Sequence, residues 1–151
     1  MAASPSKFNT FTFFKLPSAW WCGVRLKYID EKKAITTVKH KWVNQNPFKS
    51  MFWAVQGMAA ELSTGAMVID QIQQSGRKIS MLVQNNNAFF GKKATGRITF
   101  TCEDGHLIAD AIQKTIETGE GQKFWMKSVG VNEDGVEVSV FNFEWTIRLK
   151  K

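Results

Sequence analysis

The longest apolar segment of the chain predicts one long helix that begins near Met51 and ends near Gln73. The segment is too long for one strand, and its alanine, methionine and leucine content is typical of a helix. It is apolar on nearly every side, as helices buried in a protein core or in a membrane are. Gln56, Glu61, Ser63 and Thr64 lie inside it. Because of these residues and the strand-like sequence around them, we expect burial in a core rather than a membrane span.

Alternating apolar and polar residues predict strands on both sides of this helix. The predicted strands are residues 23–28 and 34–43 before it, and 79–84, 97–102, 123–131 and 136–149 after it. Turn-forming residues at 30–33 and 132–135 predict two hairpins. In the last strand the apolar positions change parity near Val140, which predicts a β-bulge or a strong bend there. A strongly curved strand of this kind is what a sheet needs to wrap around a helix.

Two shorter helices complete the predicted pattern. Ser4 is the expected N-cap of a helix that starts at Pro5 and ends before Pro17, with Phe8, Phe11 and Leu16 toward the core. A stripe of apolar residues predicts another helix over residues 106–118. The long helix is apolar on every side, so it cannot bury all its faces on a flat sheet, whereas a curled antiparallel sheet can enclose it. We therefore predict the α+β class and the hotdog architecture, as one domain over residues 1–151 with a helical lead-in at 1–22.

The composition supports a globular core and raises the question of an anionic partner. The 151 residues are 44% hydrophobic and include 12 Phe and 6 Trp, which is ample material for one core. The net charge of +7 favours nucleic acid, a membrane or a phosphorylated cofactor as partner. No nucleic-acid motif is present, and the aromatic residues follow the apolar pattern of a core rather than the basic clusters.

The cysteines and the N-terminal sequence bear on the cellular compartment. Cys22 and Cys102 show no framework spacing, so we interpret them as two free, packed thiols, with one disulfide as the alternative. The absence of a Cys-x-x-Cys motif and of a His/Cys cluster argues against a zinc site. Polar residues interrupt the apolar stretch at residues 7–15, which lacks the core of a signal peptide. We expect a protein of the reducing cytoplasm.

The sequence around the start of the long helix resembles the hotdog thioesterase superfamily. Asn46-Pro47-Phe48-Lys49-Ser50-Met51-Phe52 leads into Met58-Ala59-Ala60-Glu61-Leu62-Ser63-Thr64-Gly65. This is similar to the loop and central helix of an uncharacterised branch of short, single-domain thioesterases. In that branch an Asn and a Ser or Thr precede the helix, and Ala-Glu-Leu-x-x-Gly lies within it. The resemblance covers most of the chain from Val24 onward and extends more weakly to residues 89–96.

The resemblance implies hydrolysis of an acyl-CoA or another acyl thioester. It also implies at least a homodimer with clefts at the interface, and no cofactor beyond the coenzyme A of the substrate. The sequence departs from better-known hotdog enzymes at two points. Lys49-Ser50 stands where His-Gly-Gly often opens their helix, and Gly57 falls about where they carry a catalytic carboxylate, one turn before Glu61.

Glu61 is the main catalytic candidate. Ser50, Ala54, Gly57 and Glu61 are spaced to lie along one side of the helix, and Glu61 is the only charge between Lys49 and Asp70. A carboxylate in apolar surroundings is costly unless it is paired, hydrated or used, and those surroundings raise its pKa. It can act as a general base that activates water, or as a nucleophile. The alternative is a structural glutamate that caps backbone groups or pairs with a Lys or Arg.

The other candidates are expected to stabilise the oxyanion or bind substrate. Backbone amides at Ser50 and Met51 are predicted donors to the oxyanion, assisted by the helix dipole, and Asn46 either adds a donor or shapes its loop. The predicted substrate-binding residues are Gln56, Gly57, Asn86, Asn87, Lys92, Lys93 and Arg97. The two asparagines suit an acyl or pantetheine chain, and the three cations suit the phosphates of coenzyme A. Each has a structural alternative. For Gln56 it is a hydrogen bond to the sheet, for the two asparagines an exposed strand end, and for Lys92 and Lys93 an exposed turn.

Three other functions remain as alternatives. A non-catalytic hotdog module that binds an acyl or aromatic ligand, or a partner protein, is favoured by the missing His-Gly-Gly. A dehydratase or hydratase of the same fold is disfavoured because neither His40 nor His106 is placed to work with an acidic residue. A nucleic-acid binder would need strongly salt-dependent binding to an oligonucleotide.

Overall fold

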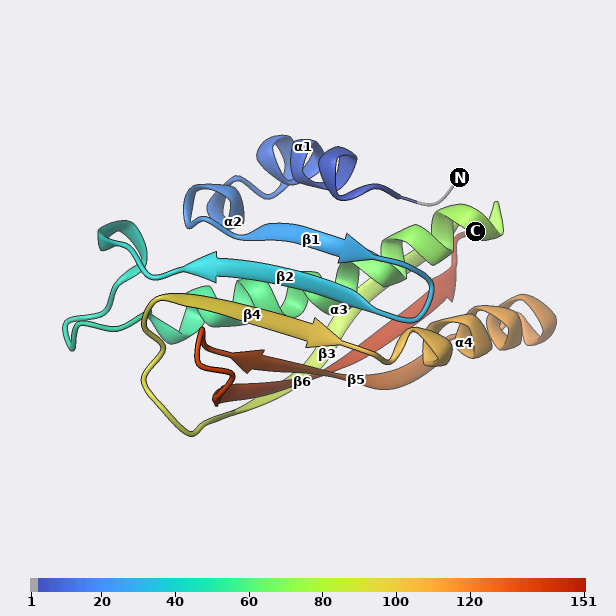
Figure 1. Ribbon diagram of the computed structural model, residues 1–151. Helices are drawn as coiled ribbons and strands as arrows, with labels where there is room; N and C mark the ends of the chain where they lie inside the picture. Colours follow the sequence, from blue (N-terminus) through green and yellow to red (C-terminus); the bar gives the residue numbers. More distant parts are fainter. Residues whose placement is uncertain (1–2) are drawn as a thin grey trace.

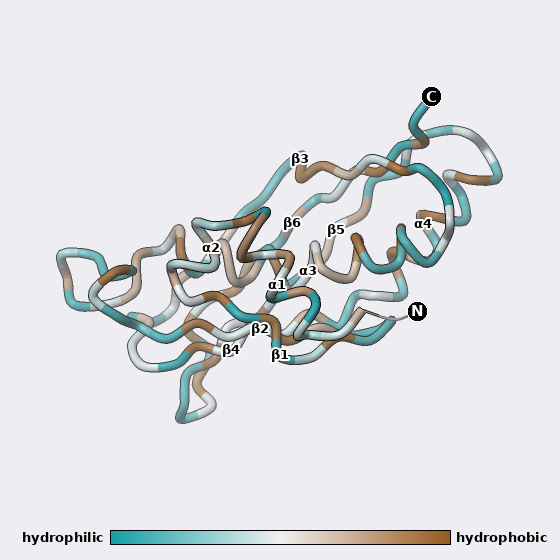
Figure 2. The backbone as a smooth tube through the Cα atoms, turned by 90° about the horizontal axis from the view of Figure 1, so that it is seen from above, coloured by the Kyte–Doolittle hydropathy of each residue, from teal (hydrophilic) through white to brown (hydrophobic). Residues whose placement is uncertain are grey.

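A six-stranded antiparallel sheet, in the order β1-β2-β4-β5-β6-β3, curls around one long helix (Figure 1). The computed structural model describes residues 3–151, so the first two residues of the predicted lead-in lie outside the described range. The strands are β1 Arg25–Ile29, β2 Ala34–Lys39, β3 Ile79–Phe90, β4 Arg97–Cys102, β5 Gln122–Val131 and β6 Glu137–Leu149. The helices are α1 Pro5–Lys15, α2 Pro17–Trp21, α3 Trp53–Ser75 and α4 Gly105–Thr118, with a 3-10 turn at Trp42–Asn44. Viewed from above, β3, β6 and β5 lie on one side of α3 and β1, β2 and β4 on the other (Figure 2).

The central helix α3 confirms the prediction of one long buried helix in an α+β fold. It begins at Trp53 and ends at Ser75, two residues later at each end than predicted, and Gly76 stops it in the left-handed conformation with φ 68°. Its buried residues face the sheet on several sides, as expected for a helix enclosed by strands. Phe52 is the residue before the helix, and its side chain makes no capping hydrogen bond to the amides of the first turn.

The curvature of the sheet comes from bulges in its long strands. In β6 the register slips between Ser139, opposite Gly130, and Glu137, opposite Val131, so Val138 is the extra residue. Val138 and Ser139 are therefore both buried although they are adjacent in a strand. The predicted bulge near Val140 is confirmed two residues earlier, and it bends β6 around α3.

Two local predictions were wrong. Phe8 is buried, but Phe11 and Leu16 are 40% and 39% exposed, because α1 covers only the edge of the sheet. The strand predicted at 34–43 ends at Lys39. The chain turns there because the Asn44 side chain accepts from the Lys41 amide and donates to the Lys39 carbonyl. The same side chain also donates to the Cys22 carbonyl in another segment, which is the longer-range contact that ends the strand.

The two edges of the sheet differ. Asn9 of α1 bonds both backbone groups of Leu26 in β1, accepting from its N–H at 2.8 Å and donating to its carbonyl at 2.9 Å. The outer edge of β3 has no strand or helix paired to it within the described chain. An open edge of this length is a ready place for another strand to pair. No helix in residues 3–151 is long and apolar enough to cross a membrane.

Candidate active site

Glu61 lies in the middle of α3 and faces the connection between α1 and α2. A pocket of about 280 Å³ separates them, lined by Met58 and Glu61 of α3 and by residues 15–19. Burial raises the pKa of Glu61 to about 7, and no neighbouring charge or hydrogen bond within the described residues offsets that shift. The pairing or capping that a structural glutamate would need is therefore missing among residues 3–151.

A chain of hydrogen bonds fixes the helix backbone at Glu61. The indole N–H of Trp145 in β6 donates to Thr64 Oγ1 at 2.9 Å, and the Thr64 hydroxyl donates to the backbone carbonyl of Glu61 at 2.8 Å. Thr64 is fully buried and Trp145 is 3% exposed. These bonds hold the turn of α3 that carries the carboxyl group against the sheet.

A second pocket, of about 530 Å³, lies where α3 begins. The loop before α3, the buried Gln56 and the turn after β3 line it. Five of the predicted site residues meet there: Asn46, Ser50, Gln56, Lys92 and Lys93. Aromatic side chains form much of the rest of the wall: Phe48, Phe52, Trp53 and Phe90. The pocket therefore combines an apolar wall with two lysines and contains no acidic side chain.

The predicted oxyanion donors at Ser50 and Met51 are not available. The Ser50 amide donates to Asn46 Oδ1 at 3.3 Å, and the Met51 amide donates to Ala94 O at 2.8 Å. Both residues precede the helix, because this bond to Ala94 ties the chain to the turn after β3. The amides of Trp53 and Ala54 in the first turn of α3 have no acceptor within the described residues. The free amides at the start of α3 are therefore those of Trp53 and Ala54.

Asn46 shapes the loop, as one of its two expected roles required. Its carboxamide oxygen accepts from the Phe48 amide at 2.9 Å, and its NH₂ group donates to Ser50 Oγ at 2.9 Å. Lys49, at the turn, has a positive φ of 61°. The side chains of Asn46 and Ser50 therefore bond to each other rather than to an open site.

Gln56 is the most unusual polar residue of this second pocket. It is 4% exposed, and its Oε1 atom has no hydrogen-bond donor among the described residues. A buried carbonyl oxygen without a donor is costly, so a bound molecule that supplies an N–H or O–H would be favoured there. The predicted alternative for Gln56 was a hydrogen bond to the sheet, and Oε1 makes no such bond within the part of the chain that the structure describes.

The remaining predicted residues lie outside both pockets. Gly57 packs toward Phe141, and Asn86 and Asn87 lie on exposed β3, where Asn87 accepts from Asn142 at 2.9 Å. The Arg97 backbone N–H donates to Glu133 at 2.8 Å, and its side chain reaches Thr37 Oγ1 at 3.4 Å. Arg97 therefore does not join Lys92 and Lys93.

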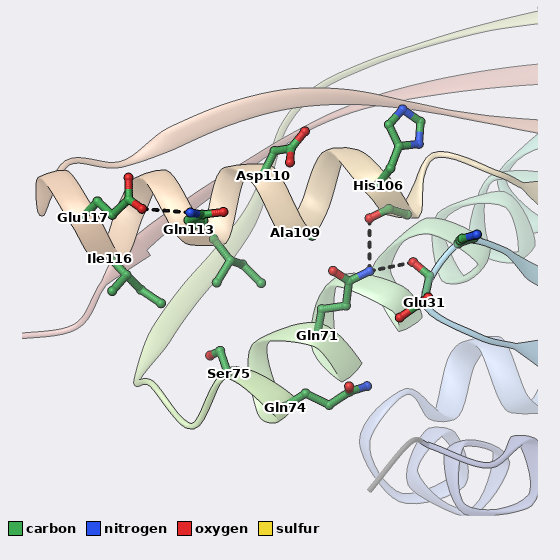
Figure 3. Close-up of a pocket in the computed structure, with 13 residues that line it drawn as sticks. Glu31, Gln71, Gln74, Ser75, His106, Ala109, Asp110, Gln113, Ile116 and Glu117 are labelled. Atoms are coloured by element: carbon green, nitrogen blue, oxygen red, sulfur yellow. Dashed lines mark hydrogen bonds between the residues drawn. The ribbon is translucent and has the colours of Figure 1, made fainter.

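A third pocket, of about 700 Å³, lies between the C-terminal half of α3 and α4 (Figure 3). None of the predicted site residues lines it. Gln71 points across it and donates to the carbonyls of Glu31 and Gly105, at 2.9 and 3.1 Å. Its lining comes from three segments that share no motif, so the sequence carried no signal for it. Gln71 lies ten residues after Glu61, roughly 15 Å along the helix, so this pocket is separate from Glu61.

Neither the cysteines nor a metal cluster adds a reactive group within residues 3–151. Cys22 is half-buried, Cys102 is buried, and both are free. Burial raises the pKa of the Cys102 thiol to about 12, so it is not a nucleophile. No cluster of three or more His, Cys, Asp or Glu residues that could hold a metal occurs within residues 3–151.

Comparison with known proteins places the chain in a family. Residues 5–147 match a family described as a domain of unknown function, DUF4442. The chain belongs to the DUF4442 family. A comparison with curated proteins gave no significant match for this DUF4442 protein.

Solved structures similar to this DUF4442 protein have the same fold. Protein PA5026 of Pseudomonas aeruginosa, of unknown function and described as a probable thioesterase, has a TM-score of 0.82 at 18% identity, with 99% of each chain covered. A protein of unknown function from Chlorobaculum tepidum has a TM-score of 0.83 at 18% identity, covering 97% of this chain and 94% of that one. Thioesterase HI1161 of Haemophilus influenzae has a TM-score of 0.76 at 12% identity, covering 99% and 93%. These likenesses confirm the hotdog fold and the resemblance to thioesterases of that fold.

Proposed function

We propose that this DUF4442 protein hydrolyses acyl-CoA thioesters, with Glu61 as the general base. The observation that carries the proposal is the partly buried, unpaired carboxyl group of Glu61, whose pKa is raised to about 7. A general base works best when its pKa lies near the working pH, and unpaired buried carboxyl groups are otherwise costly. The thioesterases among its structural neighbours support this class of reaction.

In the proposed reaction, Glu61 accepts a proton from a water molecule while the water oxygen attacks the thioester carbonyl carbon. The amides of Trp53 and Ala54, at the positive end of the α3 dipole, donate to the oxyanion that forms. The tetrahedral intermediate then expels the coenzyme A thiolate, which takes the proton from Glu61. The products are a carboxylic acid and free coenzyme A. A direct attack by the carboxylate, which would form an anhydride, is the alternative role of Glu61.

We propose that the cleft forms between two copies of the chain. Trp53 and Glu61 are eight residues apart, roughly 12 Å along the helix, and they line different pockets. One carbonyl carbon cannot contact both groups of a single chain. The open outer edge of β3 exposes Leu82 at 64% and Phe89 at 69%, which fits pairing with β3 of a second copy. Such a pairing would bring Glu61 of one copy toward the first turn of α3 in the other.

The second pocket suits the coenzyme A part of the substrate. Lys92 and Lys93 would pair with its phosphates, and Gln56 Oε1 would accept from an amide N–H of the pantetheine chain. Asn86 and Asn87 lie on the β3 edge that the second copy would cover. Two free cysteines fit a reducing compartment such as the cytoplasm.

The test is release of free thiol from a panel of acyl-CoAs. We expect turnover by the wild type and a loss of at least about 100-fold in kcat for Glu61→Gln, the range typical of a general base. The matched control is Asp70→Asn, an acidic residue of the same helix that bonds Ala3 N and Gln74 instead of facing a pocket. Unchanged turnover in a folded Glu61→Gln protein would remove Glu61 from the chemistry.

The second candidate function is a hotdog module that binds an acyl ligand without hydrolysing it. The observation that favours it is the mutual bonding of Asn46 and Ser50, which engages the carboxamide group of one residue and the hydroxyl group of the other in the loop before α3. Binding of acyl-CoA by calorimetry, with no thiol released from any member of the panel, would select this function.

A further inference from the structure

Basic and acidic residues are unevenly divided along the chain. Residues 1–102 contain 14 Lys and Arg against 4 Asp and Glu, whereas residues 103–151 contain 6 against 9. No acidic residue occurs in residues 32–60 or in residues 71–102. These two basic segments meet at the end of the molecule where β2 leads to α3 and β3 leads to β4 (Figure 1). The Met51 amide donates to Ala94 O across them, and Lys93 Nζ reaches Phe48 O at 3.4 Å.

Large apolar side chains are exposed among these lysines. Trp42 is 84% exposed, Val43 54% and Phe48 70%. Lys41 and Lys49, both exposed, adjoin them in the sequence. We call the following residues the aromatic–basic surface: Lys41, Trp42, Val43, Phe48, Lys49, Lys92 and Lys93.

The exposed side chains are held outward by a rigid loop. Asn44 is 2% exposed, and its side chain donates to the carbonyls of Cys22 and Lys39, both at 2.9 Å. Asn46 fixes the following turn through the Phe48 amide. Two projections of the chain between β2 and α3 stand out at this end of the molecule (Figure 1). Apolar groups kept in water cost free energy, so their fixed exposure points to a partner that covers them.

We propose that the aromatic–basic surface docks on a membrane surface that contains anionic lipids. Tryptophan and phenylalanine side chains favour the boundary between headgroups and acyl chains, and lysines pair with lipid phosphates. An acidic protein would attract the lysines equally, but separate projecting tips match a soft bilayer better than a preformed protein surface. The proposal rests on charge and exposure and does not depend on thioester hydrolysis.

The first experiment is co-sedimentation of the protein with vesicles. Vesicles of phosphatidylcholine alone are compared with vesicles that also contain phosphatidylglycerol. We expect binding to the anionic vesicles that weakens at high salt, because salt screens exposed charges. No binding to anionic vesicles, or equal binding to both kinds, would overturn the proposal. Binding to polyglutamate without binding to vesicles would assign the surface to an acidic protein instead.

Paired variants locate the contact. Trp42→Ser should weaken vesicle partition by about tenfold or more, because it removes a large apolar group from the lipid boundary. Its control is Phe14→Ser on α1, which is 71% exposed in the free protein. Lys41→Gln with Lys49→Gln should weaken partition by about 30-fold, since each lysine near an anionic surface contributes about fivefold. Its control, Lys114→Gln with Lys123→Gln, removes the same charge from α4 and β5.

The controls also decide against the proposal. Equal losses in a variant and its control would show that binding follows overall charge or hydrophobicity, and not the aromatic–basic surface. Trp42→Ser should keep its melting temperature, since the side chain is almost wholly in solvent. Hydrolysis of acyl-CoA in the absence of vesicles should also be unchanged in this variant, which separates docking from the proposed chemistry.

Discussion

Glu61 Oε1 lies 3.3 Å from the point that a Cβ atom on Gly65 would occupy. The same point is 3.1 Å from the indole ring of Trp145. Gly65 follows Glu61 by one turn of α3, so the carboxyl group rests against the helix in the space that the missing side chain leaves. The glycine of the Ala-Glu-Leu-x-x-Gly motif therefore has a steric role, which is to make room for the carboxyl group and the indole together.

Gly65→Ala should lower activity without unfolding the protein. The added methyl group must displace either the Glu61 carboxyl group or the Trp145 ring, while alanine gains up to about 1 kcal/mol in helix propensity. We expect kcat for acyl-CoA hydrolysis to fall by about tenfold or more, with a melting temperature within a few degrees of the wild type. Gly57→Ala is the control, because its Cβ would meet Phe141 at an ordinary 3.5 Å. Equal kcat values for the two variants would contradict this role of Gly65.

The raised pKa of Glu61 makes stability depend on pH. Burial raises that pKa from 4.5 to about 7, so the folded protein holds the proton more tightly than the unfolded chain. This group therefore contributes stability at low pH that is lost as the pH rises from about 4.5 to about 7. Glu61→Gln should be more stable than the wild type at pH 8, by at most about 3 kcal/mol, and equally stable near pH 4. Denaturant unfolding at both pH values measures the difference.

The same ionisation should control the rate. kcat/KM of the wild type should rise with pH and level off above about 7, the pKa of Glu61, because the base must be ionised to accept a proton. A flat profile between roughly pH 5 and pH 8 would rule out Glu61 as the base.

Trp145→Phe should weaken the support under Glu61. The substitution removes the N–H that donates to Thr64 Oγ1 and leaves this fully buried hydroxyl without its donor. We expect a loss of about 1–3 kcal/mol in the free energy of unfolding and a lower kcat. Trp125→Phe is the control, because Trp125 is 44% exposed on β5. A Trp145→Phe protein as stable as this control would show that the bond contributes little.

The parts of the fold that depend on neighbouring residues could be predicted from the sequence. The composition of residues 53–75 suffices for the long helix, and the change of parity in β6 is the direct trace of the bulge at Val138. The start of α3 could not be predicted, because it depends on the Met51 amide reaching Ala94, more than forty residues away.

In the candidate site, too, local sequence patterns were predictive and long-range contacts were not predictable. Glu61 was identifiable because a lone carboxylate in an apolar helix is conspicuous in any sequence. The separation of Arg97 from Lys92 and Lys93 depends on a contact with Glu133 in the β5–β6 turn, which no local pattern records. The free amides of Trp53 and Ala54 could not be predicted either, because the bond from the Met51 amide to Ala94 O places the start of α3 at Trp53. Sequence patterns therefore located the carboxyl group, and tertiary contacts decided which of the other predicted residues meet in the second pocket.

The open edge of β3 leads to the last prediction. Leu82→Glu with Phe89→Glu should prevent pairing of β3 with a second copy, because two buried, unpaired charges at an interface are strongly unfavourable. We expect this variant to sediment as a monomer in analytical ultracentrifugation where the wild type sediments as a dimer. The same variant should lose hydrolysis, since Glu61 and the amides of Trp53 and Ala54 would no longer meet. Trp125→Glu, an exposed position on β5 inside the sheet, is the control and should remain dimeric and active. A monomeric variant that keeps full activity would mean that one chain holds the complete site, and a wild type that is itself a monomer would exclude the shared cleft.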